Sequence, residues 1–318
     1  TPRFCDTIGA LIPPGRPPKM TERRVLSVIR GPSPALGKEL IFLGDEVRMK
    51  LNLFDSHVHT AHSFDARDGI GEICAHALDH GVMGVAITDH YDCDMVEKCH
   101  CQEIQKTFRE LPACQEAYKN RLRITKGIEL GQGQAAPDVA EAILREGGFD
   151  VVLGSIHSAG PCLDISEVDF NDPAVRVSDI LGYYFQAVYD MAVWGNFDVM
   201  AHLGYPERYI WGKYRIPVNF TPFEELIQET LRRLVDTGKG LEVNTSGYRQ
   251  GLGKTIPVTR ILQRYYQLGG RIVTLGSDAH RKEDVASDFG VAMDLLTGIG
   301  FEYFAFYRQR QPVMLKLI

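Results

Sequence analysis

Residues Leu53–Thr60 read LFDSHVHT, an apolar start that runs into two histidines separated by one residue. In a β-strand, side chains two positions apart point to the same face, so His57 and His59 are expected to project together from one strand end. Two imidazoles that converge on one point can hold a metal ion such as zinc. Because two histidines do not complete a metal site, further ligands are expected from the rest of the chain.

Several later segments repeat this pattern, in which an apolar run ends in a possible ligand. The first four runs begin at Gly84, Arg123, Val151 and Phe197, and they end at His90, Glu129, His157 and His202 in turn. The last run begins at Ile272 and leads to both Asp278 and His280. A single histidine at a strand end is usually only a polar residue near the surface. A whole series of strand ends that finish in His, Glu or Asp instead indicates a shared site, because functional residues of a barrel lie where its strands end.

Length and composition limit the possible classes of protein. The chain has 318 residues, 44% of them hydrophobic, which is enough for one α/β barrel of about 250 residues. Its net charge of −6 and pI of about 5.9 argue against a broad basic surface for nucleic acid. No apolar run approaches the roughly 18 residues that cross a bilayer, and no stretch reads as a secretory signal. We therefore expect neither a nucleic-acid nor a membrane partner.

The cysteines favour a reducing compartment. There are seven, an odd number with irregular spacing, which argues against a disulfide framework and favours the cytoplasm. The segment Cys99–Cys101, with Cys93 and Cys114 nearby, is an alternative metal site. However, Cys-X-Cys lacks the usual spacing of zinc ligands, so free thiols on a helix or loop are the simpler interpretation.

Residues 1–48 differ from the rest of the chain. They hold seven of the sixteen prolines and show no sustained hydrophobic period. Short strands at 25–29 and 40–43 are conceivable, but neither has an obvious partner. We expect residues 1–48 to be an upstream extension and residues 49–318 to form the catalytic unit.

From Met49 onward, expected strands alternate with expected helices, which predicts βαβ units and a parallel sheet. Helices are expected over 70–80, 94–118, 137–146, 179–194, 222–236 and 257–268. A sixth strand is expected over 239–245, and a terminal strand pair at 304–307 and 313–317. Thr221 is expected to cap the helix that starts at Pro222, in a capping box with Glu224. The count is seven strand units.

All candidate ligands lie at or just beyond the carboxyl ends of predicted parallel strands, which share one face of a barrel. There are nine candidates: His57, His59, Asp65, His90, Glu129, His157, His202, Asp278 and His280. One zinc ion takes four ligands, or five when its coordination expands, so two or three ions that share a bridging carboxylate are expected. Glu129 is the best bridge, because its two oxygens can bind different ions.

Clustered divalent ions suit phosphoryl transfer to water. They lower the pKa of a bound water, so that hydroxide exists near neutral pH, and they clamp the attacking and leaving oxygens. Phosphate is also bound well by arginines. Arg208 follows His202 by six residues, and Arg249 follows the sixth strand. Both are expected on loops of the catalytic face as substrate-binding residues, although each could also be a solvated loop charge.

These motifs resemble those of the PHP (polymerase and histidinol phosphatase) superfamily, and within it the histidinol-phosphatase branch. The resemblance runs from about Leu51 to the C-terminus. The matching motifs are DSHVHT at 55–60, TDH at 88–90, GIELG at 127–131, GSIHS at 154–158, AHL at 201–203, KGLEVNTS at 239–246 and LGSDAH at 275–280. There is one local departure: Gly204-Tyr205-Pro206 follows Leu203, where many relatives are expected to have Asp.

The resemblance implies a distorted (β/α)7 barrel with up to three zinc, manganese or iron ions, in agreement with the seven strand units. The first implied ligand set is His57, His59, Glu129 and Asp278. The second is Asp65, His90 and Glu129, and the third is His157, His202 and His280. Glu129 and Asp278 are the expected catalytic carboxylates. Four histidines stay outside these sets: His62, His76, His80 and His100.

The leading hypothesis is a metal-dependent phosphomonoesterase that hydrolyses L-histidinol phosphate in histidine biosynthesis. A PHP phosphoesterase for another small ester, such as a nucleotide or sugar phosphate, is the alternative. An amidohydrolase also begins with His-X-His on a barrel strand, but the early Glu129 and the ending Ser277–His280 favour PHP. A metal-holding interaction module would be expected to have a degraded ligand set, and this set is intact. The acidic charge and the lack of a polymerase domain disfavour an exonuclease.

Overall fold

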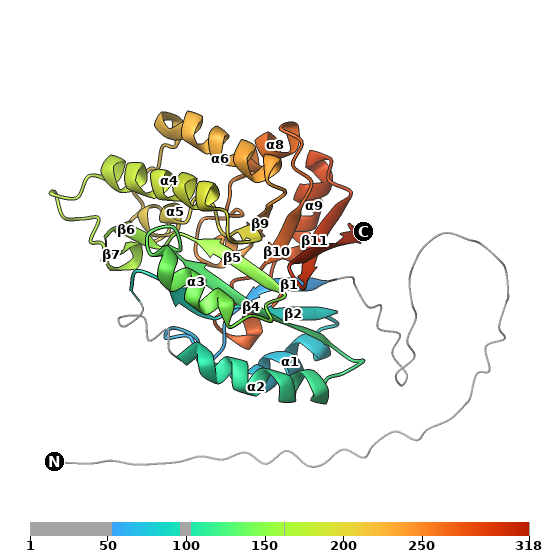
Figure 1. Cartoon of the computed structure of the whole chain (residues 1–318). Helices are drawn as coiled ribbons and strands as arrows, with labels where there is room; N and C mark the ends of the chain where they lie inside the picture. The colour runs from blue at the N-terminus through green and yellow to red at the C-terminus, as the bar shows by residue number, and fades with distance from the viewer. Residues whose placement is uncertain (1–52, 96–102, 162, 318) are drawn as a thin grey trace, which may run out of the picture. The chain divides into compact units, whose positions relative to one another are not determined.

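A computed structural model describes residues 53–95, 103–161 and 163–317 (Figure 1). The chain divides into two units between Gly37 and Lys38, and every described residue belongs to the second unit. The expectations for residues 1–48 and for Cys99–Cys101 lie outside the described residues. No helix within the described ranges is long and apolar enough to cross a membrane.

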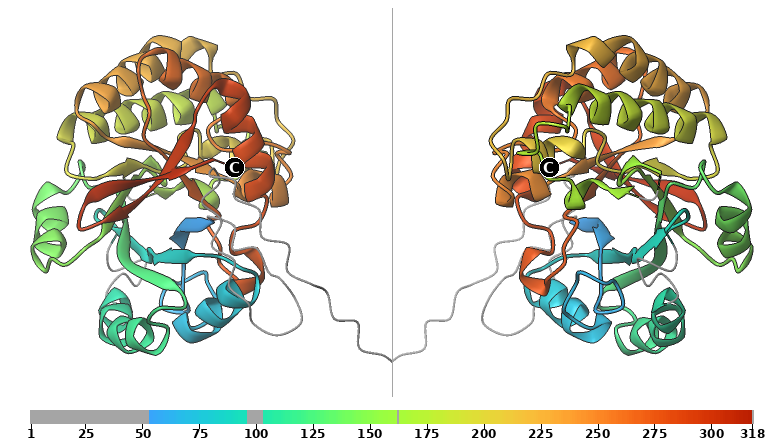
Figure 2. Two further views of the ribbon diagram at one scale, coloured as in Figure 1. Left: turned by 90° about the vertical axis from the view of Figure 1, so that its right-hand side faces the viewer. Right: turned by 90° about the vertical axis from the view of Figure 1, so that its left-hand side faces the viewer.

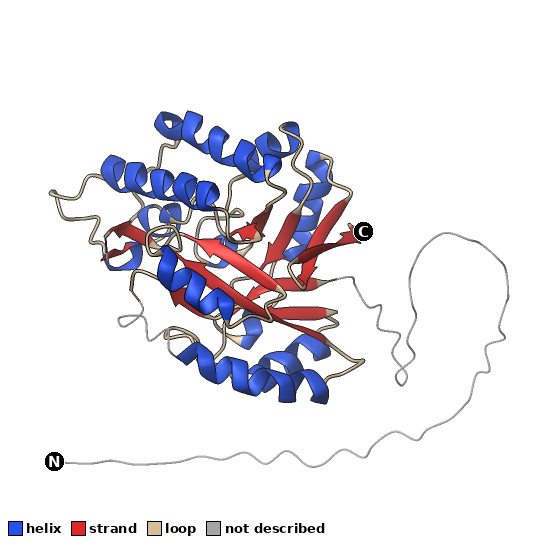
Figure 3. Cartoon of the chain, in the orientation of Figure 1, coloured by secondary structure: helices blue, strands red, loops and turns tan. Residues whose placement is uncertain are grey.

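A mostly parallel sheet lies at the centre, with helices around it (Figure 3). Seven strands pair in parallel in this order: β1 (Phe54–Val58), β2 (Gly84–Ile87), β4 (Arg123–Gly131), β5 (Val151–Ser155), β8 (Val199–Met200), β9 (Gly240–Asn244) and β10 (Val273–Gly276). β11 (Tyr303–Arg308) continues the parallel order, and β12 (Gln311–Lys316) pairs antiparallel with β11. A separate hairpin joins β6 (Ser158–Gly160) to β7 (Leu163–Asp164). The predicted strand segments and the terminal strand pair are therefore confirmed.

One additional strand, β3 (His90–Asp92), continues the line of β2 along β4. Ile87 lies opposite Lys126 and His90 lies opposite Glu129, so the line is interrupted only at residues 88 and 89. This register places the His90 and Glu129 backbones side by side on neighbouring strands. Two ligands that are far apart in the sequence are thus brought together by strand pairing alone.

The ends of β1 and β10 also meet. Val58 forms a parallel bridge with Ala279, and the His59 amide donates to the Ala279 carbonyl at 2.9 Å. The buried carboxylate of Asp55 accepts hydrogen bonds from the amides of Ser277 and Ala286. These contacts bring the first histidine pair beside Asp278 and His280.

The helices cover the sheet in groups. They are α1 (Ile70–Asp79), α2 (Ile104–Ala117), α3 (Pro137–Arg145), α4 (Val177–Trp194), α6 (Glu224–Asp236), α8 (Thr259–Gln267) and α9 (Phe289–Ile299). α1 packs with α2 on one side, whereas α4, α6 and α8 pack together on the opposite side (Figure 2). α4 buries Tyr184, Val188 and Met191, as its apolar period predicts.

Two expectations about helix starts are wrong. α2 begins at Ile104, and Asp94 and Met95 precede it outside any helix. The predicted capping box at Thr221 is also absent: residues 221–223 form a 3-10 turn, and α6 begins at Glu224 without a side-chain cap. The reason is local, because the side chain of Asn219 accepts the Thr221 amide at 3.0 Å and forms an Asx turn.

Candidate metal centre

Glu129, near the end of β4, is completely buried at the centre of a histidine cluster. Its Oε2 lies 2.8 Å from His90 Nδ1, 3.3 Å from His57 Nε2 and 3.4 Å from His59 Nε2. Its Oε1 lies 2.7 Å from His202 Nε2 and 3.1 Å from His157 Nε2. The two oxygens of one carboxylate therefore face two different groups of imidazoles, which is the arrangement a bridging ligand requires.

Asp278 follows β10 and adjoins the first of these groups. Its Oδ1 lies 3.4 Å from His59 Nε2 and 3.8 Å from His57 Nε2, while the two imidazole nitrogens lie 3.0 Å apart. The Asp278 backbone has a φ of 55°, in the left-handed region. His202 is also left-handed, with a φ of 23°. Such conformations cost energy and recur at functional sites, where the surroundings hold them in place.

Asp65 and His280 form a third group together with His90. Asp65 Oδ2 lies 3.0 Å from His280 Nε2, and its Oδ1 lies 3.6 Å from His90 Nε2. The ring nitrogens of His59, His90 and His280 lie within 4.8 Å of one another. The resemblance implied that His280 joins His157 and His202, whereas the structure brings it beside Asp65 and His90.

The donor set fits divalent metal ions. Imidazole nitrogens and carboxylate oxygens are the ordinary ligands of zinc and similar ions. Across the described residues, four groups of three His, Asp or Glu side chains have ligand atoms within 4.8 Å of one another. Glu129 Oε2 and His90 Nδ1 approach to 2.8 Å without the geometry of a hydrogen bond. A close approach of buried ligand atoms that no hydrogen bond accounts for is expected at a metal site.

The charges of the cluster are strongly coupled. Burial opposes ionisation of Glu129, but the neighbouring His57 and His157 outweigh it and hold the pKa of Glu129 well below its ordinary value. Burial also disfavours a charged His57, yet Glu242 and Glu129 raise its pKa well above the usual range. For His59 the balance is opposite, because burial and the nearby His90 lower its pKa. Glu129 therefore remains anionic and able to bind cations.

Carboxylates that were not predicted lie behind two of the histidines. Glu242 Oε1 lies 2.7 Å from His57 Nδ1, and Asp92 Oδ1 lies 2.8 Å from His157 Nδ1. Metal-binding histidines usually donate a hydrogen bond from the N–H of their second ring nitrogen to such a group. Glu242 belongs to the KGLEVNTS motif and Asp92 follows His90 by two residues. Glu242 lies in the expected sixth strand, whereas Asp92 lies just beyond the expected run that ends at His90, so their position near ligand-bearing strand ends was the available signal.

Both predicted arginines lie at the site and contact Asp278. Arg208 is in α5 (Pro206–Ile210), and its Nη1 lies 2.9 Å from Asp278 Oδ2. Arg249 ends α7 (Ser246–Arg249), and its Nη2 donates to the Asp278 carbonyl at 2.6 Å. Burial disfavours the charge of Arg208, but Asp278 outweighs it and raises the pKa of the guanidinium. Arg208 therefore stays charged beside the carboxylate.

The departure from the expected motif after Leu203 has a structural reason. Gly204 has a φ of 112°, which side-chain-bearing residues rarely adopt, and it lets the chain turn into α5. The ring of Tyr205 then packs 4.8 Å from His202 and 5.0 Å from His157, measured between centroids. The aromatic ring of Tyr205, and not a polar side chain, thus lies beside the candidate ligands His157 and His202.

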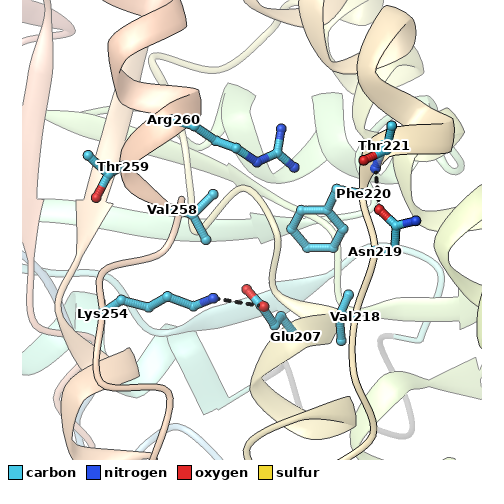
Figure 4. Close-up of a pocket in the computed structure, with 9 residues that line it drawn as sticks. All are labelled: Glu207, Val218, Asn219, Phe220, Thr221, Lys254, Val258, Thr259 and Arg260. Atoms are coloured by element: carbon cyan, nitrogen blue, oxygen red, sulfur yellow. Dashed lines mark hydrogen bonds and ion pairs between the residues drawn. The ribbon is translucent and has the colours of Figure 1, made fainter.

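Glu207 of α5 lines a separate pocket of about 400 Å³ (Figure 4). Lys254, Phe220 and Arg260 also line this pocket. Lys254 Nζ lies 2.8 Å from Glu207 Oε1. This ion pair connects α5 to the segment before α8, and α5 carries Arg208. The ion pair therefore helps to hold α5 in place from outside the metal centre.

The other described histidines lie apart from the ligand groups. His62 Nε2 pairs with Glu110 at 3.0 Å, and His76 and His80 stack on each other at the exposed end of α1. His100 lies outside the described residues. Phe64, which the sequence did not single out, is 54% exposed, with its ring centroid 5.4 Å from that of His90. It places an aromatic surface at the rim of the site.

Comparison with known proteins identifies the family. Residues 55–246 match the PHP domain family. The chain belongs to this family. The resemblance found in the sequence is therefore confirmed. Arg249, Asp278 and His280 lie beyond the matched residues, so their placement rests on the geometry described above.

Several members of the family are similar over most of the chain. A probable histidinol-phosphatase of Thermotoga maritima is 30% identical over 80% of this chain and 95% of its own length. A histidinol-phosphatase of Lactococcus lactis is 24% identical over 71% of this chain and 83% of its own. The crystal structure of the histidinol phosphate phosphatase from Lactococcus lactis, complexed with zinc, L-histidinol and phosphate, has a TM-score of 0.68. It is 22% identical and covers 82% of this chain and 99% of its own, and this likeness establishes a shared fold.

Proposed function

We propose that the protein is a metal-dependent phosphomonoesterase that hydrolyses L-histidinol phosphate to L-histidinol and phosphate in histidine biosynthesis. The observation that carries the proposal is Glu129, whose two oxygens face separate groups of histidines with two arginines close by. Relatives named histidinol-phosphatase, at 24 to 30% identity over most of the chain, support the substrate.

The distances support three divalent ions with a revised division of ligands. The first set is His57, His59, Asp278 and Glu129 through Oε2. The second set is Asp65, His90 and His280, and the third is His157, His202 and Glu129 through Oε1. In the division implied by the resemblance, Glu129 belonged to the second set and His280 to the third. In the revised division, His280 belongs to the second set and Glu129 to the third. Zinc, manganese or iron would suit these nitrogen and oxygen ligands, and the imidazole-rich sets favour zinc or iron.

The chemistry follows from what this site can bind. Divalent ions held there lower the pKa of a bound water and offset the charge of the phosphate. Glu129 fixes the spacing between ligand sets, because one rigid carboxylate belongs to two of them. Arg208 and Arg249 offer guanidinium N–H groups to the phosphate oxygens, where charge develops as the ester bond breaks. Asp278 contacts both the histidine pair and Arg208, so it aligns the ligands with the phosphate-binding residue.

We further propose that the sheet is a distorted (β/α)7 barrel. The parallel bridge between Val58 and Ala279 joins the ends of the first and seventh parallel strands and supports closure. The thiols of Cys74, Cys93 and Cys114 are free, which supports a reducing compartment such as the cytoplasm.

A phosphate-release assay tests the proposed activity. Purified protein is loaded with zinc, manganese or iron and offered histidinol phosphate together with nucleotide and sugar phosphates. The expected result is a kcat/KM at least about a hundredfold higher for histidinol phosphate than for the other esters, which corresponds to about 2.7 kcal/mol. Equal rates on all esters, or activity that survives removal of metal, would contradict the proposal.

A phosphatase for another small ester is the second candidate. Two relatives, at 28 and 29% identity, are named only as probable phosphatases. Gly204 stands directly after Leu203, where Asp is expected in many relatives, and the ring of Tyr205 that follows it changes the surface beside the metal centre. In the same assay, a preference for a nucleotide or sugar phosphate would favour this candidate.

A further inference from the structure

Glu242 lies in the middle of β9, is only 1% exposed, and is surrounded by hydrogen-bond donors. Its Oε1 lies 2.7 Å from His57 Nδ1. Its Oε2 accepts the backbone amide of His202 at 2.7 Å and the side-chain amide of Asn244 at 3.1 Å. One buried carboxylate thus contacts a ligand on each side of Glu129.

The contact with His57 determines which ring nitrogen can bind a metal. An ionised carboxylate only accepts hydrogen bonds, so His57 must carry its proton on Nδ1. The neutral ring then has its lone pair on Nε2, which is the atom 3.3 Å from Glu129 Oε2 and 3.0 Å from His59 Nε2. Glu242 therefore selects the tautomer of His57 that presents a ligand atom to the first set.

The contact with His202 holds a strained backbone. His202 has a φ of 23°, outside the favoured regions for a residue with a side chain. The hydrogen bond from its amide to Glu242 secures this conformation, from which Nε2 reaches Glu129 Oε1 at 2.7 Å. Loss of the bond would allow the ring to turn away from the third set.

We propose that Glu242 is a positioning residue that prepares two metal-ligand sets at once, through the tautomer of His57 and the backbone of His202. The inference rests on the proposed metal centre. It does not depend on which phosphate ester is the substrate, because the hydrogen bonds of the Glu242 carboxylate in the described structure go to two ligands and Asn244.

A glutamine cannot replace this carboxylate. If its amide oxygen faces His57, its NH₂ group opposes the His202 amide, and two donors meet. If the amide is reversed, its NH₂ group donates to His57 Nδ1, which places the ring proton on Nε2 and removes the ligand atom. Either orientation leaves one of the two ligand sets impaired.

The neighbouring strand leaves room for this side chain. A Cβ atom at Gly276 would collide with Glu242 Oε1 and lie 2.8 Å from the Cβ of His57. Gly276 does not have a positive φ, so an alanine there is not excluded by backbone conformation. Gly276→Ala therefore displaces Glu242 and crowds the Cβ of His57, without changing the chemistry of either side chain.

The same arrangement recurs at His157, in another set. Asp92 Oδ1 lies 2.8 Å from His157 Nδ1, and a Cβ at Gly131 would collide with Asp92 Oδ1. Gln132 Nε2 donates to that same oxygen at 3.1 Å. A carboxylate behind a histidine, next to a glycine on an adjacent strand, thus occurs twice in this centre.

The test measures zinc affinity by chelator competition on zinc-loaded wild type, Glu242→Gln, Glu242→Asp and Gly276→Ala. At least one zinc ion should bind about ten- to a hundredfold more weakly in each variant. After cobalt substitution, the visible absorption of the variants should differ from that of wild type. With saturating zinc, kcat should partly recover, whereas KM should stay near the wild-type value because Glu242 does not touch the substrate.

Asp198→Asn is the matched control, because Asp198 is a buried carboxylate that bonds to Val152 and Arg310, away from the histidines. It should keep wild-type zinc affinity even if its free energy of unfolding falls. Wild-type zinc affinity and cobalt spectrum in Glu242→Gln would overturn the inference. If Glu242→Gln does not fold, wild-type affinity in both Gly276→Ala and Glu242→Asp would overturn it equally.

The role of Glu242 and the proposed activity can be refuted independently of each other. Zinc loss in the Glu242 variants of a protein that does not hydrolyse histidinol phosphate would leave the inference intact and refute the substrate. An active wild type whose Glu242 variants bind zinc normally would refute the inference alone. A wild type that binds no metal would overturn both.

Discussion

Glu129 has more influence on the centre than any single-set ligand, because each of its oxygens belongs to a different set of imidazoles. Glu129→Ala should therefore release more than one ion per chain and lower kcat/KM by about a thousandfold or more, or about 4 kcal/mol. His280→Ala is the matched comparison, since in the proposed division His280 is a ligand of one set only, the set with Asp65 and His90. Elemental analysis and steady-state kinetics of both variants test this. Equal metal content in the two variants would show that Glu129 does not bridge.

The two arginines meet at Asp278 but differ in how they contact it. Arg208 pairs with the carboxylate, while Arg249 donates to the backbone carbonyl and lies 3.5 Å from Asp284. Replacing either by Ala should cost roughly 2–4 kcal/mol in kcat/KM, or about thirty- to a thousandfold, and both kcat and KM should change. Lys should recover only part of this, because it lacks the planar fork. Near wild-type kcat/KM with full metal in both Ala variants would show that the metals alone hold the phosphate.

At the scale of elements, the turn between β8 and α5 positions Tyr205 and Arg208. Its conformation depends on Gly204, whose φ of 112° is strained for any other residue. Gly204→Ala should lower the free energy of unfolding by about 1–3 kcal/mol and also reduce kcat/KM, because α5 carries Arg208. Gly298→Ala in α9 is the control, since a Cβ there meets nothing within 4 Å. It should be neutral or stabilising by up to about 1 kcal/mol. Denaturant unfolding of both variants measures the change in the free energy of unfolding, and steady-state kinetics measure the change in kcat/KM.

The secondary-structure elements also show which parts of the site could be predicted from the sequence. The ligand-bearing strand ends were predictable, because hydrophobic runs followed by His, Glu or Asp mark where parallel strands stop. The grouping of His280 with Asp65 was not predictable, because it depends on how two loops fold over the strand ends. Glu242 was also missed, because the partner of a side chain within a sheet depends on which strands are neighbours. The Thr221 cap failed because Asn219, two residues earlier, competes for the same amide.

At the scale of the whole molecule, metal binding and protonation compete. In the protein without metal, burial opposes the charge on His57, His90 and His157, but neighbouring carboxylates outweigh it and raise their pKa values. These protons stabilise the metal-free fold below the unfolded pKa of about 6.5, and that stabilisation is lost as pH rises through the raised values. Metal needs the unprotonated rings, so its affinity rises over the same range.

The gap in Tm between metal-loaded and metal-free protein should therefore widen as the pH rises above about 6.5. Calorimetry in two buffers of different ionisation enthalpy should also detect more than one proton released per chain at neutral pH. Thermal unfolding across this pH range provides the first measurement. A gap that stays constant, together with no proton release, would mean that these histidines are already neutral before metal binds.

The boundary of the catalytic unit is the remaining question at this scale. Residues 1–48 supply no candidate ligand, and β1 starts at Phe54, so a chain beginning at Met49 retains every described strand and the whole metal centre. It should fold cooperatively, bind the same number of ions and keep its kcat within about twofold, because the removed residues include none of the candidate ligands. A chain beginning at Lys38, the start of the second unit, is the matched comparison. If the longer chain is active and the shorter one is insoluble or inactive, residues 38–48 belong to the catalytic unit and the boundary at Met49 is wrong.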